Sequence, residues 1–113
     1  PAGKYAQEVL TSLKIADRVN DQAVYGKDVR QVLNYVATGN VDAGIVYRTD
    51  AQVANNVEIA AIAPETSHSP VIYPIAVIKN SDNPETATEL IEFLTTQEAQ
   101  AVFKEYGFVT MNN

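Results

Sequence analysis

Tyr47 is the side chain whose type and position first suggest chemistry. It ends the apolar run from Asp42 to Tyr47, Asp-Ala-Gly-Ile-Val-Tyr, which turn-forming residues bound on both sides. Its hydroxyl is either a donor aimed at a ligand or the polar tip of a core residue. The run by itself favours the core interpretation, because buried tyrosines usually find a hydrogen-bond partner.

Two expected helix starts offer backbone N–H groups. Ala2 and Gly3 precede the first helical pattern and bring no side chain that could cap it. This start is either a frayed terminus or, because its amides are bare, a site for an anion. At the second start the amide nitrogens of Val29 and Arg30 lie in the first turn, where they have no intrahelical acceptor. Arg30 itself is expected to be solvated.

The remaining polar groups argue against catalysis. His68 is the only histidine, and it has no acidic or histidine neighbour at metal-ligand spacing, so we expect it to be solvated. Asp42 and Asp50 flank the apolar run and are expected to be a solvated start and a cap. Motifs for nucleophilic, phosphate-binding, dinucleotide-binding and zinc chemistry are absent. The sequence therefore predicts a protein that is not an enzyme and that holds neither a cofactor nor a direct metal ligand.

Composition excludes further classes of partner. The 113 residues amount to one domain, with 46% hydrophobic residues and no cysteine. Eight basic against fourteen acidic residues give a net charge of −6, which argues against a nucleic-acid partner because such binding needs a basic surface. No apolar run is long enough to span a membrane, and the sequence contains no signal-peptide pattern.

The elements that must position these groups indicate an α/β fold. Residues 42–47 have the pattern of a strand buried on both faces in a mostly parallel sheet, where ligands bind at the carboxyl ends of strands. Residues 23–25, followed by a turn at Gly26 and Lys27, and residues 57–63 are further strand candidates. Residues 71–78 are apolar but contain Pro74, so we expect an extended segment that crosses between sheets or breaks at an edge.

Helical patterns separate the expected strands. Apolar residues recur at helical spacing over 5–13, and again over 29–36 after Asp28, the expected N-cap, with a stop at Gly39. Residues 49–54 indicate a short helical turn. Two amphipathic helices close the chain. The first begins at Asn83-Pro84, and the second begins at a capping box of Thr95 with Glu98 and stops at Gly107. The chain offers no further strands to receive these two helices.

Five stretches, in this order and with fitting spacings, resemble the second half of the periplasmic molybdate-binding proteins, which are the solute receptors of molybdate ABC transporters. The resemblance covers essentially the whole chain. The stretches are Pro1-Ala2-Gly3-Lys4-Tyr5-Ala6; Asp28-Val29-Arg30; Gly44-Ile45-Val46-Tyr47 with Thr49-Asp50-Ala51; Tyr73-Pro74-Ile75-Ala76-Val77; and Phe103-Lys104-Glu105-Tyr106-Gly107-Phe108.

The resemblance implies one lobe of a type II periplasmic binding protein, in which a mixed sheet is flanked by helices. Residues 1–72 would form the second, ligand-binding lobe. Residues 73–113 would form the return crossover and the C-terminal helices, which would pack on a first lobe that this chain does not contain. The signal peptide would likewise lie outside this fragment, and the protein would be periplasmic, or extracellular and membrane-anchored in a Gram-positive source.

The resemblance also implies the ligand and its contacts. Molybdate or tungstate would be bound by the backbone N–H groups of Ala2 and Val29 and by the hydroxyl of Tyr47, all through oxygen atoms of the anion. Because a ligand position of the family falls on Tyr47, the resemblance favours a ligand role for this residue over a role in the core. Asp28 and Arg30 match the family but are given no direct contact. The receptor would deliver the anion to the permease subunits of an ABC importer.

Two alternatives remain open from the sequence. The chain could be a receptor for another small anion such as sulfate, or the ligand-sensing lobe of a transcription regulator built on the same fold. The apolar faces around Leu90, Leu94, Val102 and Phe103 also predict that the fragment associates with itself or exchanges elements, because large apolar patches seldom stay exposed.

Overall fold

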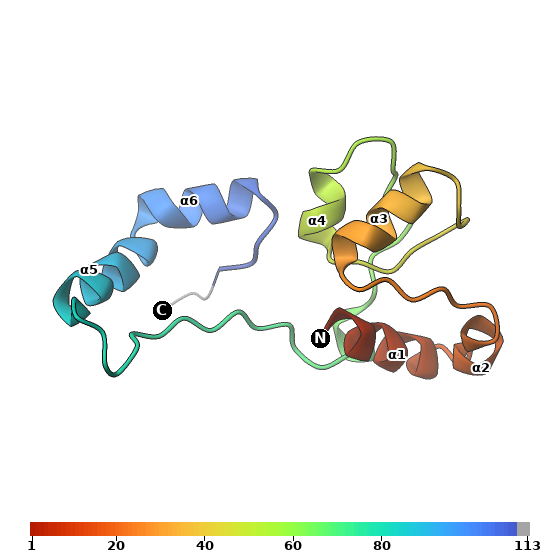
Figure 1. Cartoon of the computed structure of the whole chain (residues 1–113), viewed down its shortest axis with the longest axis horizontal. Helices are drawn as coiled ribbons and strands as arrows, with labels where there is room; N and C mark the ends of the chain where they lie inside the picture. Colours follow the sequence, from red (N-terminus) through yellow and green to blue (C-terminus); the bar gives the residue numbers. More distant parts are fainter. Residues whose placement is uncertain (111–113) are drawn as a thin grey trace. The chain divides into compact units, whose positions relative to one another are not determined.

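The computed structural model describes residues 1–110 and divides the chain into two compact units, with the boundary between Pro70 and Val71. The first unit contains most of the helices, and the second contains a helical pair (Figure 1). In the first unit the elements are α1 (Ala2–Ser12), α2 (Ala16–Asn20), α3 (Val29–Ala37), α4 (Arg48–Gln52) and the 3-10 turn η1 (Glu65–Ser67).

Helix α1 follows the predicted pattern. It begins directly after Pro1 without a side-chain cap, and its apolar face buries Val9 and Leu10. It packs on α2 and on η1. Helix α2 was not expected, because the stretch that contains it is mostly polar. The pair Ile15 and Val19, four residues apart, was the available signal for it.

Helix α3 confirms the predicted start and stop. Asp28 is its N-cap and accepts a hydrogen bond from the Gln31 amide at 2.8 Å. The chain leaves the helix at Gly39, whose φ of +72° is a conformation that glycine adopts without steric cost. Helix α4, which packs on α3, confirms the short helical turn predicted after Tyr47.

The expected sheet is absent: no residue from 1 to 110 is in a β-strand. Residues 23–26, 43–47 and 57–64 are non-helical segments without ladder pairing, so the predictions of strands at 23–25, 42–47 and 57–63 were wrong. A strand needs a neighbour whose N–H and C=O groups complete a ladder, and an apolar pattern cannot supply that neighbour. The run 42–47 is also not buried on both faces, since Ile45 is 48% exposed.

The second unit begins with a stretch, residues 71–78, that is neither helical nor paired, in agreement with the break expected at Pro74. Helix α5 (Pro84–Leu94) has proline at its start as predicted. Helix α6 (Gln97–Glu105) begins one residue later than predicted. Its cap is Thr96, whose hydroxyl accepts from the Ala99 amide at 3.4 Å, whereas Thr95 is the C-cap of α5 and still has a helical conformation.

In the second unit α5 packs on α6 (Figure 1). Aromatic contacts add to this packing. The ring of Phe108 meets Tyr73 and Phe103 edge to face, with centroid distances of 5.9 and 6.2 Å. Gly107, with φ of +83°, confirms the predicted stop of the last helix. Within residues 1–110 no helix is long and apolar enough to cross a membrane.

Candidate functional site

An open groove of about 1310 Å³ lies within the first unit, lined by residues between Pro1 and Tyr47. Ala2, Val29 and Tyr47 are all among the residues that line it, although they come from three separate segments. Each of the three lies at the beginning of a helix: Ala2 and Val29 are the first residues of α1 and α3, and Tyr47 directly precedes α4. The groove therefore gathers three helix starts.

The start of α1 presents backbone N–H groups and no charge from a capping side chain. The Pro1 carbonyl accepts from the amides of Lys4 and Tyr5 at 3.0 and 3.2 Å. The amides of Ala2 and Gly3 precede these and have no acceptor within the helix. A Cβ at Gly3 would meet nothing within 4 Å, so this backbone is open to an approaching group.

The start of α3 is rigidly capped. Asp28 Oδ1 accepts from the Gln31 amide, and Gln31 Oε1 in turn accepts from the Lys27 amide, both at 2.8 Å. The amide of Val29 lies in the same turn and has no acceptor within the helix. Because the cap fixes the backbone on both sides of Val29, its N–H group has a defined direction.

Tyr47 does not stand at the end of a strand, as the sequence suggested. It is the N-cap residue of α4, with extended backbone, and its carbonyl accepts from the amides of Asp50 and Ala51 at 3.1 and 3.2 Å. Tyr47 is half-buried and lines the groove. Tyr47 is therefore a groove residue and not part of a closed core.

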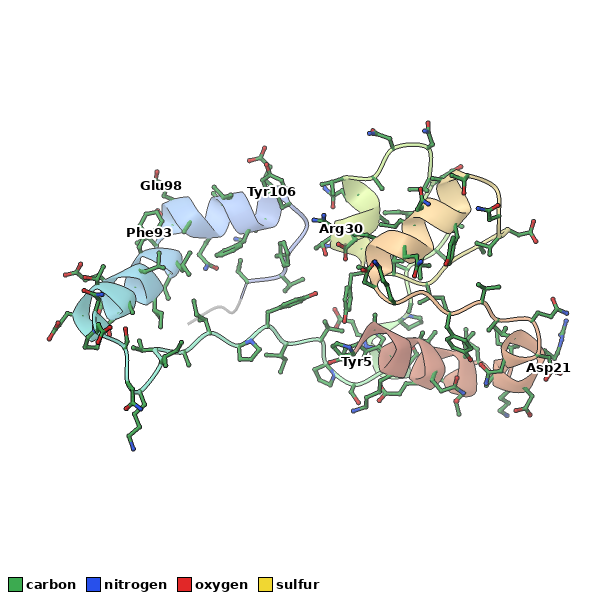
Figure 2. The ribbon with its side chains drawn as sticks, viewed as in Figure 1. Tyr5, Asp21, Arg30, Phe93, Glu98 and Tyr106 are labelled. Carbon is green, nitrogen blue, oxygen red and sulfur yellow. The ribbon has the colours of Figure 1, made fainter. Side chains whose placement is uncertain are left out.

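The other polar candidates are arranged differently. Arg30, at the start of α3 (Figure 2), is exposed and is not among the residues that line the groove. Asp42 lines the groove, whereas Asp50 lies in the first turn of α4. His68 lies away from the groove and is half-buried, so the expectation of a solvated side chain holds only in part. No group of three or more potential metal-ligating side chains occurs in residues 1–110.

His68 belongs to a set of contacts between α1 and the loop after η1. The rings of Tyr5, labelled on α1 in Figure 2, and His68 meet edge to face at 6.1 Å, and the Tyr5 hydroxyl lies 3.5 Å from the Pro70 carbonyl. Glu8 accepts from the backbone and side chain of Ser69 at 2.5 and 3.1 Å. The Ser69 amide is the main reason that the pKa of Glu8 is lowered.

The sequence interpretation missed the role of two glycines in the walls of the groove. Gly26 was assigned to a turn and Gly44 to a motif, but both lie against Val32 of α3. For Gly44 the signal in the sequence was a glycine inside an apolar run, which often marks a close approach of two backbones.

Comparison with known proteins finds relatives along nearly the whole chain. The Bacillus subtilis protein YvgL, assigned as a substrate-binding lipoprotein of an ABC transporter, is 52% identical over 108 residues, 96% of this chain and 42% of that protein. The molybdate-binding proteins ModA of Haemophilus influenzae and Escherichia coli are 42% and 37% identical, with the same shares covered.

A solved structure is similar as well. A substrate-binding domain from Clostridium difficile, assigned to a molybdenum ABC transporter, superposes with a TM-score of 0.82 at 41% identity, covering 99% of this chain and 49% of that one. The chain thus spans less than half the length of these relatives.

The groove thus brings together two helix starts and a tyrosine as candidate hydrogen-bond donors. The chain belongs to the family of bacterial extracellular solute-binding proteins, whose family model matches residues 1–109. The relatives named above are likewise described as substrate-binding or molybdate-binding proteins.

Proposed function

We propose that this protein is the solute receptor of a molybdate ABC importer and that its groove binds one side of the oxyanion. The observation that carries the proposal is the convergence of Ala2, Val29 and Tyr47 on a single groove. The names of the ModA relatives support molybdate as the ligand. Tungstate, a tetrahedral dianion of the same kind, is the second expected ligand.

The proposed mechanism uses neutral donors. The N–H groups of Ala2 and Val29 lie at helix starts, where the helix dipoles favour negative charge. The Tyr47 hydroxyl donates a third hydrogen bond. Hydrogen bonds to an ionised acceptor are stronger than neutral ones, so the dianion needs no basic side chain, and the net charge of −6 does not exclude binding.

In the whole receptor, residues 1–72 would form the second lobe, and residues 73–113 the return crossover with helices that pack on the first lobe. Donors of both lobes would enclose the anion, so this chain alone should bind it more weakly than the two lobes together. The bound receptor would dock on the permease subunits of the importer. It would act in the periplasm, or outside the cell on a lipid anchor, as the B. subtilis lipoprotein suggests.

The test is isothermal titration of the protein, in the form the cell makes, with molybdate, tungstate and sulfate. We expect binding of the first two and not of sulfate. Replacing Tyr47 with Phe removes one hydrogen bond to a charged group, worth about 1.5 to 3 kcal/mol, and should weaken molybdate binding about ten- to a hundredfold.

The matched control is Tyr106→Phe, because Tyr106 is an exposed tyrosine of the second unit. This variant should bind like the wild type. Preference for sulfate would indicate a receptor for another anion. No binding of any of the three anions would reject the proposed function. Equal affinities of the wild type and Tyr47→Phe would reject the donor role of Tyr47.

A further inference from the structure

Two glycines of the groove walls lie against the same side chain of α3. A Cβ added at Gly26 would lie 2.8 Å from Val32 Cγ2, and one added at Gly44 would lie 2.7 Å from Val32 Cγ1. Neither glycine has a positive φ, whereas Gly39 and Gly107 do. Space, and not backbone conformation, therefore requires glycine at positions 26 and 44.

The two methyl groups of Val32 thus contact different glycines, one each. Val32 is half-buried on α3, and a β-branched side chain in a helix has one strongly preferred rotamer, so both methyl positions are fixed by the helix. Cγ2 faces the segment that precedes α3, and Cγ1 faces the segment that precedes α4. Val36 Cγ2 adds a second contact, at 3.0 Å from a Cβ at Gly44.

The positions of the glycines in the chain connect this packing to the site. Gly26 stands three residues before Val29, and Gly44 stands three residues before Tyr47. Both segments that lead to these two groove residues are therefore in contact with one rigid side chain. Separations of 2.7 and 2.8 Å between carbon atoms are overlaps, so a methyl group added at either glycine must displace that segment or Val32.

We propose that Val32 is a positioning residue that sets the distance between the Val29 N–H group and the Tyr47 hydroxyl, with Gly26 and Gly44 as the spaces into which its methyl groups fit. This inference rests on the proposed function, because the two donors are those assigned to the oxyanion. A methyl group at position 44 would push residues 43–47 away from α3 and carry Tyr47 with them.

The experiment compares Gly44→Ala, Val32→Ala and the double variant, with meta-fluorotyrosine placed at position 47. Fluorine NMR then reports the surroundings of Tyr47 without any ligand. We expect the resonance to shift in Gly44→Ala and to return most of the way in the double variant, because Val32→Ala vacates the space that the new methyl group needs. A Gly44→Ala protein that folds only when combined with Val32→Ala supports the proposal equally.

Molybdate titration of the same variants gives the second readout. Gly44→Ala should weaken binding at least tenfold, and the double variant should regain most of that loss. The control is Gly39→Ala, which is strained by its φ of +72° but would meet nothing within 4 Å. It should lower the urea midpoint of unfolding while leaving the affinity and the Tyr47 resonance unchanged.

The outcomes separate the two proposals. An unchanged Tyr47 resonance in Gly44→Ala, or no restoration in the double variant, overturns the positioning role whether or not molybdate binds. If the wild type binds molybdate, and the double variant regains the Tyr47 resonance but not the affinity, the positioning role is also overturned. If the wild type does not bind molybdate, but the Tyr47 resonance shifts in Gly44→Ala and returns in the double variant, only the proposed ligand is rejected.

Discussion

Single side chains join parts of the first unit that lie far apart in the sequence. Glu8 on α1 is the strongest case, because its carboxylate accepts two hydrogen bonds from Ser69, 61 residues further along. Lys4 adds an ion pair at 3.8 Å, and His68 adds a favourable charge interaction. These contacts fix α1, whose first residue lines the groove, against the loop that ends the unit.

The lowered pKa of Glu8 predicts how stability depends on pH. The causes are, first, the Ser69 amide, with smaller help from the Ser69 hydroxyl and the charges of Lys4 and His68, while desolvation opposes them. The folded protein holds this carboxylate ionised below its ordinary pKa of 4.5, where the unfolded chain already binds a proton. The stabilisation is therefore present above pH 4.5 and lost as the pH falls through the folded pKa.

Glu8→Gln should make the stability of the protein less dependent on pH in the acidic range, because the amide keeps an acceptor for Ser69 but has no charge to neutralise. The measurement is the urea midpoint of unfolding across the acidic range. Glu89→Gln, on the exposed face of α5, serves as the control and should follow the wild type. Coincident pH curves for Glu8→Gln and the wild type would show that the Ser69 contact does not govern acid stability.

At the scale of elements, the beginnings of helices carry the proposed site. Helix α3 is the best defined, because the side chains of Asp28 and Gln31 accept from the amides of Gln31 and Lys27, on either side of the proposed donor Val29. The first position of a helix tolerates proline, which has no N–H group. Asp28 has φ of −156° and ψ of 170°, an extended conformation that also suits the residue before a proline.

Val29→Pro therefore deletes the proposed donor while keeping the helix. We expect molybdate affinity to fall about ten- to a hundredfold, as for loss of one hydrogen bond to a charged group. Val29→Ala, which keeps the N–H group, corrects for the lost side chain. Gln97→Pro, at the equivalent position of α6, should leave affinity unchanged. Equal binding by Val29→Pro and Val29→Ala would remove this amide from the site.

At the scale of the whole molecule, each unit exposes large apolar side chains and buries few. Among the described residues only Val9, Leu10 and Ala99 are buried apolar side chains. In the second unit Leu90 and Val102 are about half exposed, at 54% and 50%. Such surfaces favour association, because burying apolar area releases about 25 cal/mol per Å².

The 113-residue chain by itself should therefore associate through α5 and α6. Sedimentation equilibrium should give a mass that rises with concentration, and the double variant Leu90→Gln/Val102→Gln should lower that mass toward the monomer. A mass that stays monomeric at every concentration would contradict this prediction.

The sequence by itself determined most of the helical elements, though not α2, because their signals are local. The cap at Asp28, the stops at Gly39 and Gly107, and the proline at the start of α5 act within one turn, and each stands where it was predicted. The shift of one cap from Thr95 to Thr96 shows the precision of such signals, since neighbouring threonines compete for the same role. The family followed from short stretches in a fixed order.

Only the tertiary structure decided which distant groups meet. The apolar run 42–47 looked like a central strand, but pairing depends on a partner that no local pattern specifies, and the run instead lies against Val32 through Gly44. The groove that collects Ala2, Val29 and Tyr47, and the bond from Ser69 to Glu8, join residues tens of positions apart. Such contacts depend on how the helices pack, and packing is a property of the folded chain as a whole.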